Sequence, residues 1–408
     1  MIMANNNNKD KCNVPHLRFP EFTGEWKMAT FGDIAKGFDY GMNAAAKSFD
    51  GNNKYIRITD IDEVSSQYLY DDVVSPDGEL EDRYLVKEND ILLARTGAST
   101  GKSYLYRNSD GKLYFAGFLI RANIYKHNSY FVFSQLHTLR YKKWISVMSA
   151  RSGQPGINSQ EYASFPVYTT SLQEEDKIAT FLKLLDERII TQNKIIEKYE
   201  SLIKGLNDSL YAQYGDDVLT SFSSLGFSYS GLSGKSAQDF GSGKPFITYL
   251  NVYSNNIINE KDFQYVAIKE GEKQNVVEYG DVLFTLSSET PEEVGIGSVY
   301  LGNENVYLNS FCFGIHIINT KIAFPPYLSY YVSSTPFRKF IYPYAQGSTR
   351  FNLCKVDFEK ASIKLPSLEN QKRIYSILSH IESKTETEKS LLDLYNSQKQ
   401  YLLRQMFI

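Results

Sequence analysis

The chain of 408 residues contains the octapeptide Ser171-Leu172-Gln173-Glu174-Glu175-Asp176-Lys177-Ile178, and 196 positions later it contains a similar one, Ser367-Leu368-Glu369-Asn370-Gln371-Lys372-Arg373-Ile374. After both octapeptides, apolar and aromatic residues keep the same register. The matching pairs are Leu182 and Leu378, Leu185 and Ile381, Tyr199 and Tyr395, Leu206 and Leu402, and Leu210 and Met406. A long internal repeat is the sequence signature of duplicated structural units. The sequence therefore predicts two similar modules.

The stretches before the octapeptides also repeat, in the same order. The pairs are 55–59 (Tyr-Ile-Arg-Ile-Thr) with 246–250 (Phe-Ile-Thr-Tyr-Leu), 89–93 (Asn-Asp-Ile-Leu-Leu) with 279–284 (Tyr-Gly-Asp-Val-Leu-Phe), and 115–120 (Phe-Ala-Gly-Phe-Leu-Ile) with 308–313 (Leu-Asn-Ser-Phe-Cys-Phe). The chain is thus predicted to be two copies of a globular module followed by a long helix.

Residues 171–214 and 367–408 have the apolar spacing of coiled-coil helices. Spacings of four and three alternate in the first run, which is a heptad pattern. Its members are Ile178, Leu182, Leu185, Ile189, Gln192, Ile196, Tyr199, Ile203, Leu206 and Leu210. The second run keeps the pattern, but Thr385, Glu388 and Lys399 interrupt it. Because one chain carries both helices and polar interruptions disfavour symmetric self-pairing, we expect an intramolecular antiparallel coiled coil.

The two modules, residues 15–170 and 222–364, have the composition of β-rich domains. Runs of Tyr, Phe, Ile and Val separated by Gly, Asn and Asp are typical of strands and turns. Apolar residues return at helical spacing in 130–149 and 326–342, which predicts one shorter helix in each module. The expected fold class is α+β, with two β-rich domains in tandem. The Asn-rich residues 1–14 are expected to form a disordered tail.

Composition narrows the class of protein. Net charge is -3, but residues 95–151 carry ten Lys and Arg against one acid, Asp110, and residues 305–355 carry five against none. Local positive potential concentrates a polyanion at a surface whatever the net charge. Three cysteines without paired spacing predict neither a disulfide framework nor a metal site, and a reducing cytoplasm is the expected location. The polar N-terminus resembles neither a signal peptide nor a membrane span.

Three motifs resemble catalytic or cofactor-binding signatures without meeting their requirements. Residues 97–103 end in Gly-Lys-Ser, but three residues separate Gly97 from Gly101 where a phosphate-binding loop has four. Residues 239–243 and 324–327 resemble methyltransferase motifs, yet no alternating strand and helix pattern surrounds them, and Phe324 stands where a polar residue is needed. The sequence therefore predicts a protein that is not itself an enzyme and holds no cofactor or metal.

Polar loops at matching places, 150–158 and 345–352, are the best candidates for reading DNA. Arg and Gln recognise guanine and adenine edges through pairs of hydrogen bonds, and glycine allows the backbone to approach the duplex. Basic residues elsewhere in each module would contact phosphates. The candidate DNA-binding residues are Arg57, Arg95, Thr96, Ser99, Lys102, Arg121, Lys142, Lys143, Arg151, Gln154, Asn158, Lys235, Lys244, Thr248, Ser287, Ser288, Gln346, Ser348, Thr349 and Arg350.

The chain resembles the specificity subunits of type I restriction-modification systems. The resemblance lies in the opening segment 14–26 (Val-Pro-His-Leu-Arg-Phe-Pro-Glu-Phe-Thr-Gly-Glu-Trp), in the helix starts at 172–175 and 368–371, and in the repeat architecture. It implies that each module is a target recognition domain for one half of a split DNA sequence. The helices, 171–214 and 367–408, would be the family's central and C-terminal conserved regions.

The resemblance also implies partners. These are double-stranded DNA, two modification (adenine methyltransferase) subunits and two ATP-dependent restriction subunits, with S-adenosylmethionine, ATP and Mg²⁺ bound by the partner subunits. It does not fix the bases that each module reads. The residues leave three alternatives open: a self-contained DNA methyltransferase, a scaffold whose β modules bind peptides, and a specificity subunit of a related system with a fused restriction-modification partner.

Overall fold

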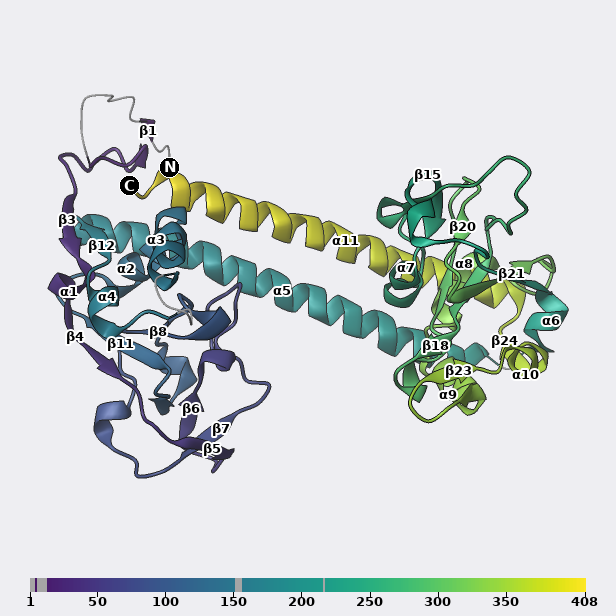
Figure 1. Ribbon diagram of the computed structural model, residues 1–408, viewed down its shortest axis with the longest axis horizontal. Coiled ribbons are helices and arrows are strands. Elements are labelled where there is room, and N and C mark those ends of the chain that lie inside the picture. The colour runs from purple at the N-terminus through teal and green to yellow at the C-terminus, as the bar shows by residue number, and fades with distance from the viewer. Residues whose placement is uncertain (1–3, 6–12, 151–155, 216) are drawn as a thin grey trace. The chain divides into compact units, whose positions relative to one another are not determined.

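The computed structural model describes residues 4–5, 13–150, 156–215 and 217–408. The chain forms two compact units (Figure 1). Unit 1 comprises residues 1–193 and 390–408, and unit 2 comprises residues 194–389. Each unit contains one module together with parts of both long helices.

The centre of module one is a four-stranded antiparallel sheet. Its strand order is β4 (Ala35–Tyr40), β11 (Leu119–Ile124), β8 (Asp90–Ala94) and β9 (Ser103–Leu105). Ile91 and Leu93 face one hydrophobic cluster, whereas Leu92 and Ala94 face another. Both faces of β8 are therefore buried, which explains why this strand reads as a continuous apolar run. Further strand pairs in the module are β3 (Lys27–Thr30) with β12 (Pro166–Thr169), β5 (Ala45–Ser48) with β7 (Val74–Asp77), and, in parallel, β6 (Lys54–Ile56) with β10 (Leu113–Phe115).

Module two repeats this topology. Its four-stranded sheet has the order β14 (Gly226–Ser230), β21 (Cys312–Ile317), β17 (Val282–Thr285) and β19 (Gly297–Val299). The antiparallel pair β13 (Val218–Thr220) and β24 (Ile363–Leu365) corresponds to β3 and β12. The parallel pair β15 (Phe240–Ile247) and β20 (Tyr307–Leu308) corresponds to β6 and β10, and β16 (Gln264–Val266) extends it. The duplication predicted from the sequence therefore includes the strand order.

The single short helix predicted in each module is in fact two helices. Residues 130–149 form α2 (Ser129–Gln135) and α3 (Leu139–Ser149), and residues 326–342 form α8 (Pro325–Tyr331) and α9 (Thr335–Ile341). The second helix of each pair starts at a hydroxyl cap: Thr138 accepts a hydrogen bond from the Tyr141 backbone N–H, and Ser334 accepts one from Phe337. Such caps favour a helix start, so the break follows from local sequence. The remaining helices of the modules are α1 (Phe31–Ile34), α4 (Ser159–Ala163), α6 (Phe222–Leu225), α7 (Tyr249–Ser254) and α10 (Lys355–Lys360).

The long helices α5 (Leu172–Tyr214) and α11 (Leu368–Gln405) pack against each other in both units. In unit 1, the early part of α5 meets the late part of α11, and Asp186 pairs with Lys399 at 2.7 Å. In unit 2, the late part of α5 meets the early part of α11, and Glu200 pairs with Lys389 at 3.0 Å. The two helices are therefore antiparallel, as predicted from the heptad pattern.

A tyrosine from each module is hydrogen-bonded to a carboxylate on a long helix. Tyr130 on α2 donates to Asp186 on α5, and Tyr330 on α8 donates to Glu382 on α11. Burial and the adjacent carboxylate raise the pKa of both phenols well above the usual range. The hydroxyl groups therefore stay protonated and remain donors at neutral pH. The same tyrosine–carboxylate hydrogen bond between module and long helix thus occurs in both copies.

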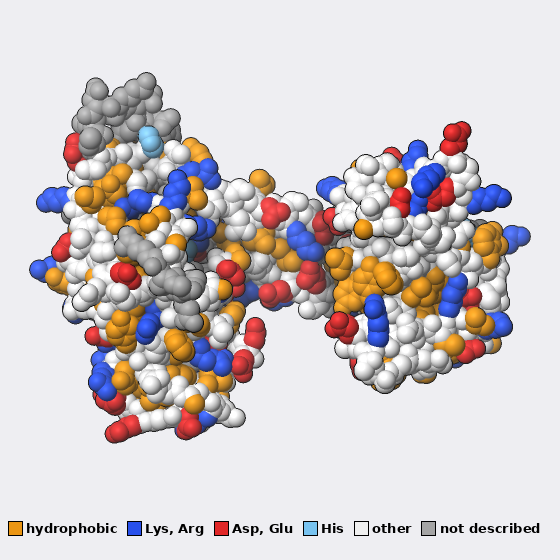
Figure 2. All heavy atoms as spheres, viewed as in Figure 1, with side chains coloured by type: hydrophobic (Ala, Val, Ile, Leu, Met, Phe, Trp, Pro, Cys, Tyr) orange, Lys and Arg blue, Asp and Glu red, His pale blue; other side chains and the backbone are white. Residues whose placement is uncertain are grey.

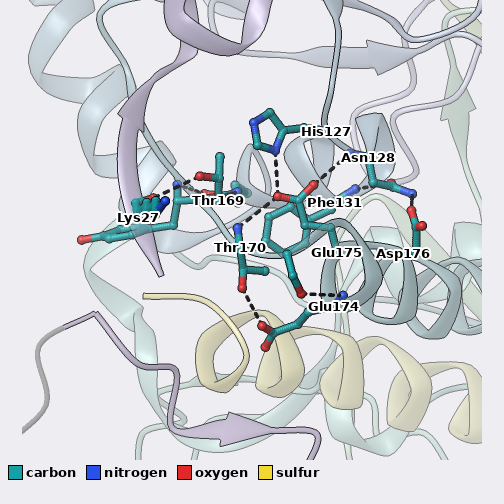
Figure 3. Close-up of polar contacts among 12 residues, drawn as sticks. Lys27, His127, Asn128, Phe131, Thr169, Thr170, Glu174, Glu175 and Asp176 are labelled. Carbon is teal, nitrogen blue, oxygen red and sulfur yellow. Dashed lines mark hydrogen bonds and ion pairs between the residues drawn. The ribbon is translucent and has the colours of Figure 1, made fainter. Parts of the chain in front are cut away.

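The start of α5 is held by two buried glutamates (Figure 3). Glu175 accepts hydrogen bonds from the Asn128 and Thr170 backbone N–H groups at 3.0 and 3.1 Å, and lies 2.9 Å from His127 Nδ1. Glu174 accepts two hydrogen bonds from the Arg18 guanidinium, at 2.7 and 2.8 Å. Arg18 belongs to the opening segment 14–26, so this segment is anchored to the first turn of α5.

The N-terminal tail differs in part from the disordered segment predicted for residues 1–14. Ala4–Asn5 form strand β1, which pairs with β2 (Leu17–Arg18). Backbone hydrogen bonds to an ordered strand account for the structure at these two positions. Residues 1–3 and 6–12 lie outside the described part of the chain.

Candidate nucleic-acid interface

A small sheet in module two brings together most of the residues predicted to bind DNA there. Strand β23 (Phe351–Leu353) pairs with β18 (Ser287–Ser288) on one side and with β22 (Ala345–Gln346) on the other. Asn352 is opposite both Ser287 and Gln346. The turn between β22 and β23 contains the exposed residues Ser348, Thr349 and Arg350. The loop 345–352 is therefore a short hairpin with an exposed polar tip.

The tip of this hairpin combines an arginine with an exposed aromatic ring. The guanidinium carbon of Arg350 lies 5.9 Å from the ring centroid of Phe311, within the range of a cation–π contact. Ser287 and Ser288 are buried: the Ser287 carbonyl accepts from the Tyr249 hydroxyl, and the Ser288 hydroxyl donates to Glu293. The two serines support the hairpin, while Arg350 and Gln346 present the groups that reach solvent.

Module one has the corresponding arrangement around Arg95 and Thr96. Thr96 pairs with Gly156 as an isolated bridge, and the Ile157 N–H donates to the Arg95 carbonyl at 2.9 Å. The same bond occurs in module two, where the Leu353 N–H donates to the Leu286 carbonyl at 2.8 Å. The predicted residues Arg151 and Gln154 fall in 151–155, outside the described residues. The described residues that follow them, Gly156 and Ile157, make the same backbone contacts as Asn352 and Leu353 in module two.

A recess of 570 Å³ lies beside Arg95 in module one. Its lining includes Tyr40, Asn43, Thr59, Arg95 and Phe118. The Arg95 guanidinium carbon lies 4.8 Å from the Tyr40 ring centroid, so the arginine is held over an aromatic face at the edge of the recess. The recess offers cationic, amide, hydroxyl and aromatic groups in one place, which suits contact with bases and phosphates.

The remaining basic candidates of module one differ in how accessible they are. Lys142 and Lys143 are exposed on α3. Ser99 ends the short turn Gly97–Ser99 between β8 and β9, and Lys102 follows with its Nζ 3.9 Å from Glu63. This Gly-rich segment therefore forms a loop between two strands. Exposed lysines of this kind suit phosphate contacts, which position a protein on DNA without reading sequence.

Three predicted arginines and lysines are engaged in ion pairs within the modules. Arg57 pairs with Asp60 and Asp72 at 2.7 and 2.9 Å, and the hydrogen bonds to Asp60 raise its pKa further. Arg121 pairs with Asp39 at 2.7 Å. Lys235 is nearly buried and pairs with Glu272 at 2.5 Å. Their charge is largely compensated inside the module, which weakens the field that each presents to a polyanion.

Two polar candidates are helix caps, and one lysine is exposed. Asn158 accepts from the Glu161 N–H at the start of α4, and Thr248 accepts from the Asn251 N–H at the start of α7. Lys244 is exposed on β15, outside the hairpin. These three residues are not brought together with Arg350 by any contact described above. Helix capping gives Asn158 and Thr248 a structural role in addition to any contact with DNA.

Sequence reasoning missed the exposed aromatic residues next to the two loops. Phe118 and Phe311 are 59% and 56% exposed, and both precede a central strand of their sheet. On the face of unit 2 drawn in Figure 2, hydrophobic side chains lie next to Lys and Arg side chains. The signal in the sequence was the repeat of 115–120 in 308–313, which we interpreted only as strand.

Two further features of the described residues bear on the class of protein. The described residues contain no group of three or more His, Cys, Asp or Glu side chains placed to hold a metal ion. No helix among them combines the length and apolar character that crossing a lipid bilayer requires. Neither finding identifies the ligand, so the family must be established by comparison.

A family model described as the type I restriction modification DNA specificity domain matches residues 23–201 and 233–394. The chain belongs to this family. The two matches coincide with the two module-and-helix copies, so the resemblance inferred from the opening segment and helix starts is confirmed. The specificity subunit of the type I restriction enzyme MjaVIII from Methanocaldococcus jannaschii is 24% identical over 205 residues, covering 48% of this chain and 44% of that protein. The alignment thus spans less than half the length of that relative.

Solved structures support the same fold. A crystal structure of a type I restriction-modification S subunit from M. genitalium has a TM-score of 0.58 and 14% identity, covering 97% of this chain and 99% of that chain. A chain from a structural study of complex assembly and conformational transition of the type I R-M system has a TM-score of 0.56 and 15% identity. The alignment covers 95% of this chain and 97% of that chain. At these identities the likeness concerns the fold. The predicted α+β class with paired long helices is confirmed.

Proposed function

We propose that this specificity-family chain reads a bipartite DNA target. Residues 15–170 would be the target recognition domain for one half-site, and residues 222–364 the domain for the other. The main support is that two modules of the same topology carry polar segments at matching places in the repeat, 150–158 and 345–352, and that these segments differ in sequence. Similar readers with different loops suit a split, asymmetric target.

Charge and geometry within each module indicate how the contacts would be divided. Arg350 and Gln346 lie on an exposed hairpin and carry the donors and acceptors that read base edges. Lys142 and Lys143 lie on the exposed side of α3 and suit phosphate contacts. Specificity would therefore come from the loops, and most salt-dependent affinity from the lysines.

The proposal assigns bond chemistry to partner subunits. Two modification subunits would bind S-adenosylmethionine and methylate adenine, and two restriction subunits would use ATP and Mg²⁺ for translocation and cleavage. This chain would position them on DNA in the cytoplasm without holding a cofactor itself. Each copy contributes one of the antiparallel helices α5 and α11. We therefore propose that these helices form the docking platform for the partner subunits.

Selection from a randomised duplex library tests the proposal. The full chain, co-expressed with its modification subunits, is incubated with the library, and the bound duplexes are sequenced. We expect two short half-sites separated by a spacer of fixed length and no base preference. Binding to the selected duplex should weaken as salt rises, with a slope set by the number of phosphate contacts.

Two results would contradict the proposal. One is a single uninterrupted motif, which would mean that the modules do not read separate half-sites. The other is an absence of any sequence preference when the same complex binds DNA, because recognition would then belong to another subunit. Calorimetry on the isolated chain provides a separate check, since a micromolar dissociation constant for ATP or S-adenosylmethionine would place chemistry in this chain.

A further inference from the structure

Two exposed phenylalanines occupy equivalent turns in the two modules. The Leu119 N–H donates to the Ala116 carbonyl at 2.8 Å, and the Cys312 N–H donates to the Asn309 carbonyl at 3.0 Å. Each bond closes a four-residue turn, and Phe118 or Phe311 is the third residue of that turn. The turns lead into β11 and β21, the strands with corresponding positions in the two sheets.

The backbone of both phenylalanines is fixed by a second hydrogen bond. The Arg95 N–H donates to the Phe118 carbonyl at 3.1 Å, and the Leu286 N–H donates to the Phe311 carbonyl at 2.9 Å. Arg95 and Leu286 are also the residues whose carbonyls hold the polar loops. One backbone position therefore connects the aromatic turn to Ile157 in module one and to Leu353 in module two, so each ring is presented on a fixed support.

An arginine lies at each of the two turns: over the Phe311 ring in module two, and beside the backbone of the turn in module one, where the guanidinium lies over Tyr40. Arg350 lies over Phe311, and the Arg95 Nη1 lies 3.5 Å from the carbonyl of Gly117, the residue before Phe118. Both rings remain more than half exposed. A single exposed phenylalanine is common on protein surfaces and needs no explanation. The same ring at the same turn of two modules, each time with an arginine at that turn, indicates a shared ligand.

We propose that Phe118 and Phe311 are base-contacting residues, one in each half-site. The proposal rests on the proposed function, because it requires that the loops face DNA. Phenylalanine contacts bases in two ways: it packs against the thymine methyl group in the major groove, or it enters as a wedge between adjacent base pairs. Both are apolar contacts with a base, and the arginine beside the ring supplies the accompanying contact with a phosphate or a guanine edge.

The test compares Phe118→Ala, Phe311→Ala and Phe227→Ala in the full chain co-expressed with its modification subunits. Phe227 is a matched control because it is 57% exposed in the same sheet of module two, where it is opposite His316 rather than at the turn that holds Phe311. All three rings are exposed, so thermal unfolding should be unchanged and loss of binding should not reflect misfolding. The probes are the duplex selected by the wild-type complex and a scrambled duplex.

We expect Phe118→Ala and Phe311→Ala each to lower affinity for the selected duplex by about 5- to 100-fold. Affinity for the scrambled duplex should stay within about twofold, because phosphate contacts dominate non-specific binding. New selections should show relaxed preference in one half-site for Phe118→Ala and in the other for Phe311→Ala. Phe227→Ala should match the wild type in every measurement.

Two modified duplexes distinguish the kinds of contact. If the ring packs against a thymine methyl group, replacing thymine by uracil in that half-site weakens wild-type binding but not binding by the alanine variant. If it acts as a wedge, 2-aminopurine at the contacted step becomes more fluorescent with the wild type and not with the variant. Wild-type-like selectivity in both Phe118→Ala and Phe311→Ala would overturn the inference while leaving the proposed function intact. Loss of sequence preference in the wild-type complex would instead overturn the proposed function.

Discussion

Arg18 and Glu174 form a buried, two-point ion pair between the N-terminal segment and the first turn of α5. Their side chains are only 4% and 1% exposed. The Thr170 hydroxyl donates a further hydrogen bond to Glu174 at 2.6 Å. The opening segment that carries the family resemblance is thus part of the structural support of the central helix, remote from the polar loop of module one in sequence.

Replacing Arg18 with Ala should lower the free energy of unfolding by about 3 to 5 kcal/mol, because the Glu174 carboxylate would stay buried without its cation. Urea unfolding of the purified chain measures the change. Arg83→Ala is the matched control, since Arg83 pairs with Glu81 at 2.8 Å on the exposed surface. The control should cost less than about 1 kcal/mol. Equal losses in the two variants would show that the buried pair has no special role.

The substitutions Glu175→Gln and Gln371→Glu, at equivalent positions of the two long helices, should destabilise the chain by different amounts. Glu175 only accepts hydrogen bonds, whereas Gln371 accepts one from the Phe324 N–H and donates to the Ile322 and Pro366 carbonyls at 2.7 and 2.8 Å. Glu175→Gln would lose about one bond, a cost of roughly 1 to 3 kcal/mol. Gln371→Glu would place a buried carboxylate against two carbonyl oxygens, so it should destabilise the chain more.

Exposed residues in the same helical turns provide the controls for this exchange. Gln173→Glu and Glu369→Gln make the same chemical changes at exposed positions. Both should alter the unfolding free energy by less than about 0.5 kcal/mol. A Gln371→Glu variant as stable as Glu369→Gln would mean that the buried hydrogen bonds do not determine which residue each helix start requires.

Stability should fall in acid partly because of His137. Its Nδ1 lies 2.9 Å from the Phe133 carbonyl, which can only accept, so Nδ1 carries a proton, and Nε2 lies 2.9 Å from the Ser66 hydroxyl. Burial lowers the pKa of His137 to about 4. A depressed folded-state pKa means that the unfolded chain binds more protons between about pH 6.5 and 4, so this contribution is complete above pH 6.5 and lost as pH falls to 4.

The wild type loses unfolding free energy as pH falls from 6.5 to 4, and His137→Gln should reduce this loss by about 1 to 3 kcal/mol. Urea unfolding across this range measures the slope. His16→Gln is the control because His16 is exposed, and it should leave the slope unchanged. If His137→Gln and the wild type lost stability in parallel, proton uptake at His137 would not contribute.

The paired and exposed lysines of module two should separate stability from DNA binding. Lys235 donates to the Ala267 carbonyl at 2.6 Å and pairs with Glu272, so Lys235→Met should destabilise the chain but leave DNA affinity unchanged once it is folded. Lys244 is exposed, so Lys244→Ala should leave stability unchanged and lower the slope of log affinity against log salt by about 1. The reverse outcome would mean that ion pairing inside the module does not predict which cations reach DNA.

The parts of the fold that depend on local pattern could be predicted from the sequence. The heptad positions from Ile178 to Leu210 predicted the long helix and its antiparallel partner, because apolar positions recur every three or four residues. The order of strands could not be predicted, since β11 lies between β4 and β8 although both precede it in the chain. Such pairings are non-local and leave no periodic signal.

The candidate site was predicted only in outline for a similar reason. The loops at 150–158 and 345–352 followed from the repeat, and the described residues Ile157 and Leu353 make equivalent backbone contacts. Whether an Arg or Lys side chain is available to DNA depends on ion-pair partners far away in sequence. Arg121 and its partner Asp39, for example, are 82 residues apart. The exposure of Phe118 was hidden because an aromatic residue among apolar neighbours reads as part of a strand.

Exchange of one module tests the central claim most directly. Residues 222–364 are replaced by the corresponding module of another specificity subunit of the family, and the complex with modification subunits is put through the duplex selection. We predict that one half-site is replaced by a new sequence while the other half-site and the spacer length are unchanged. A change in both half-sites, or in neither, would contradict the claim that each module reads one half of the target.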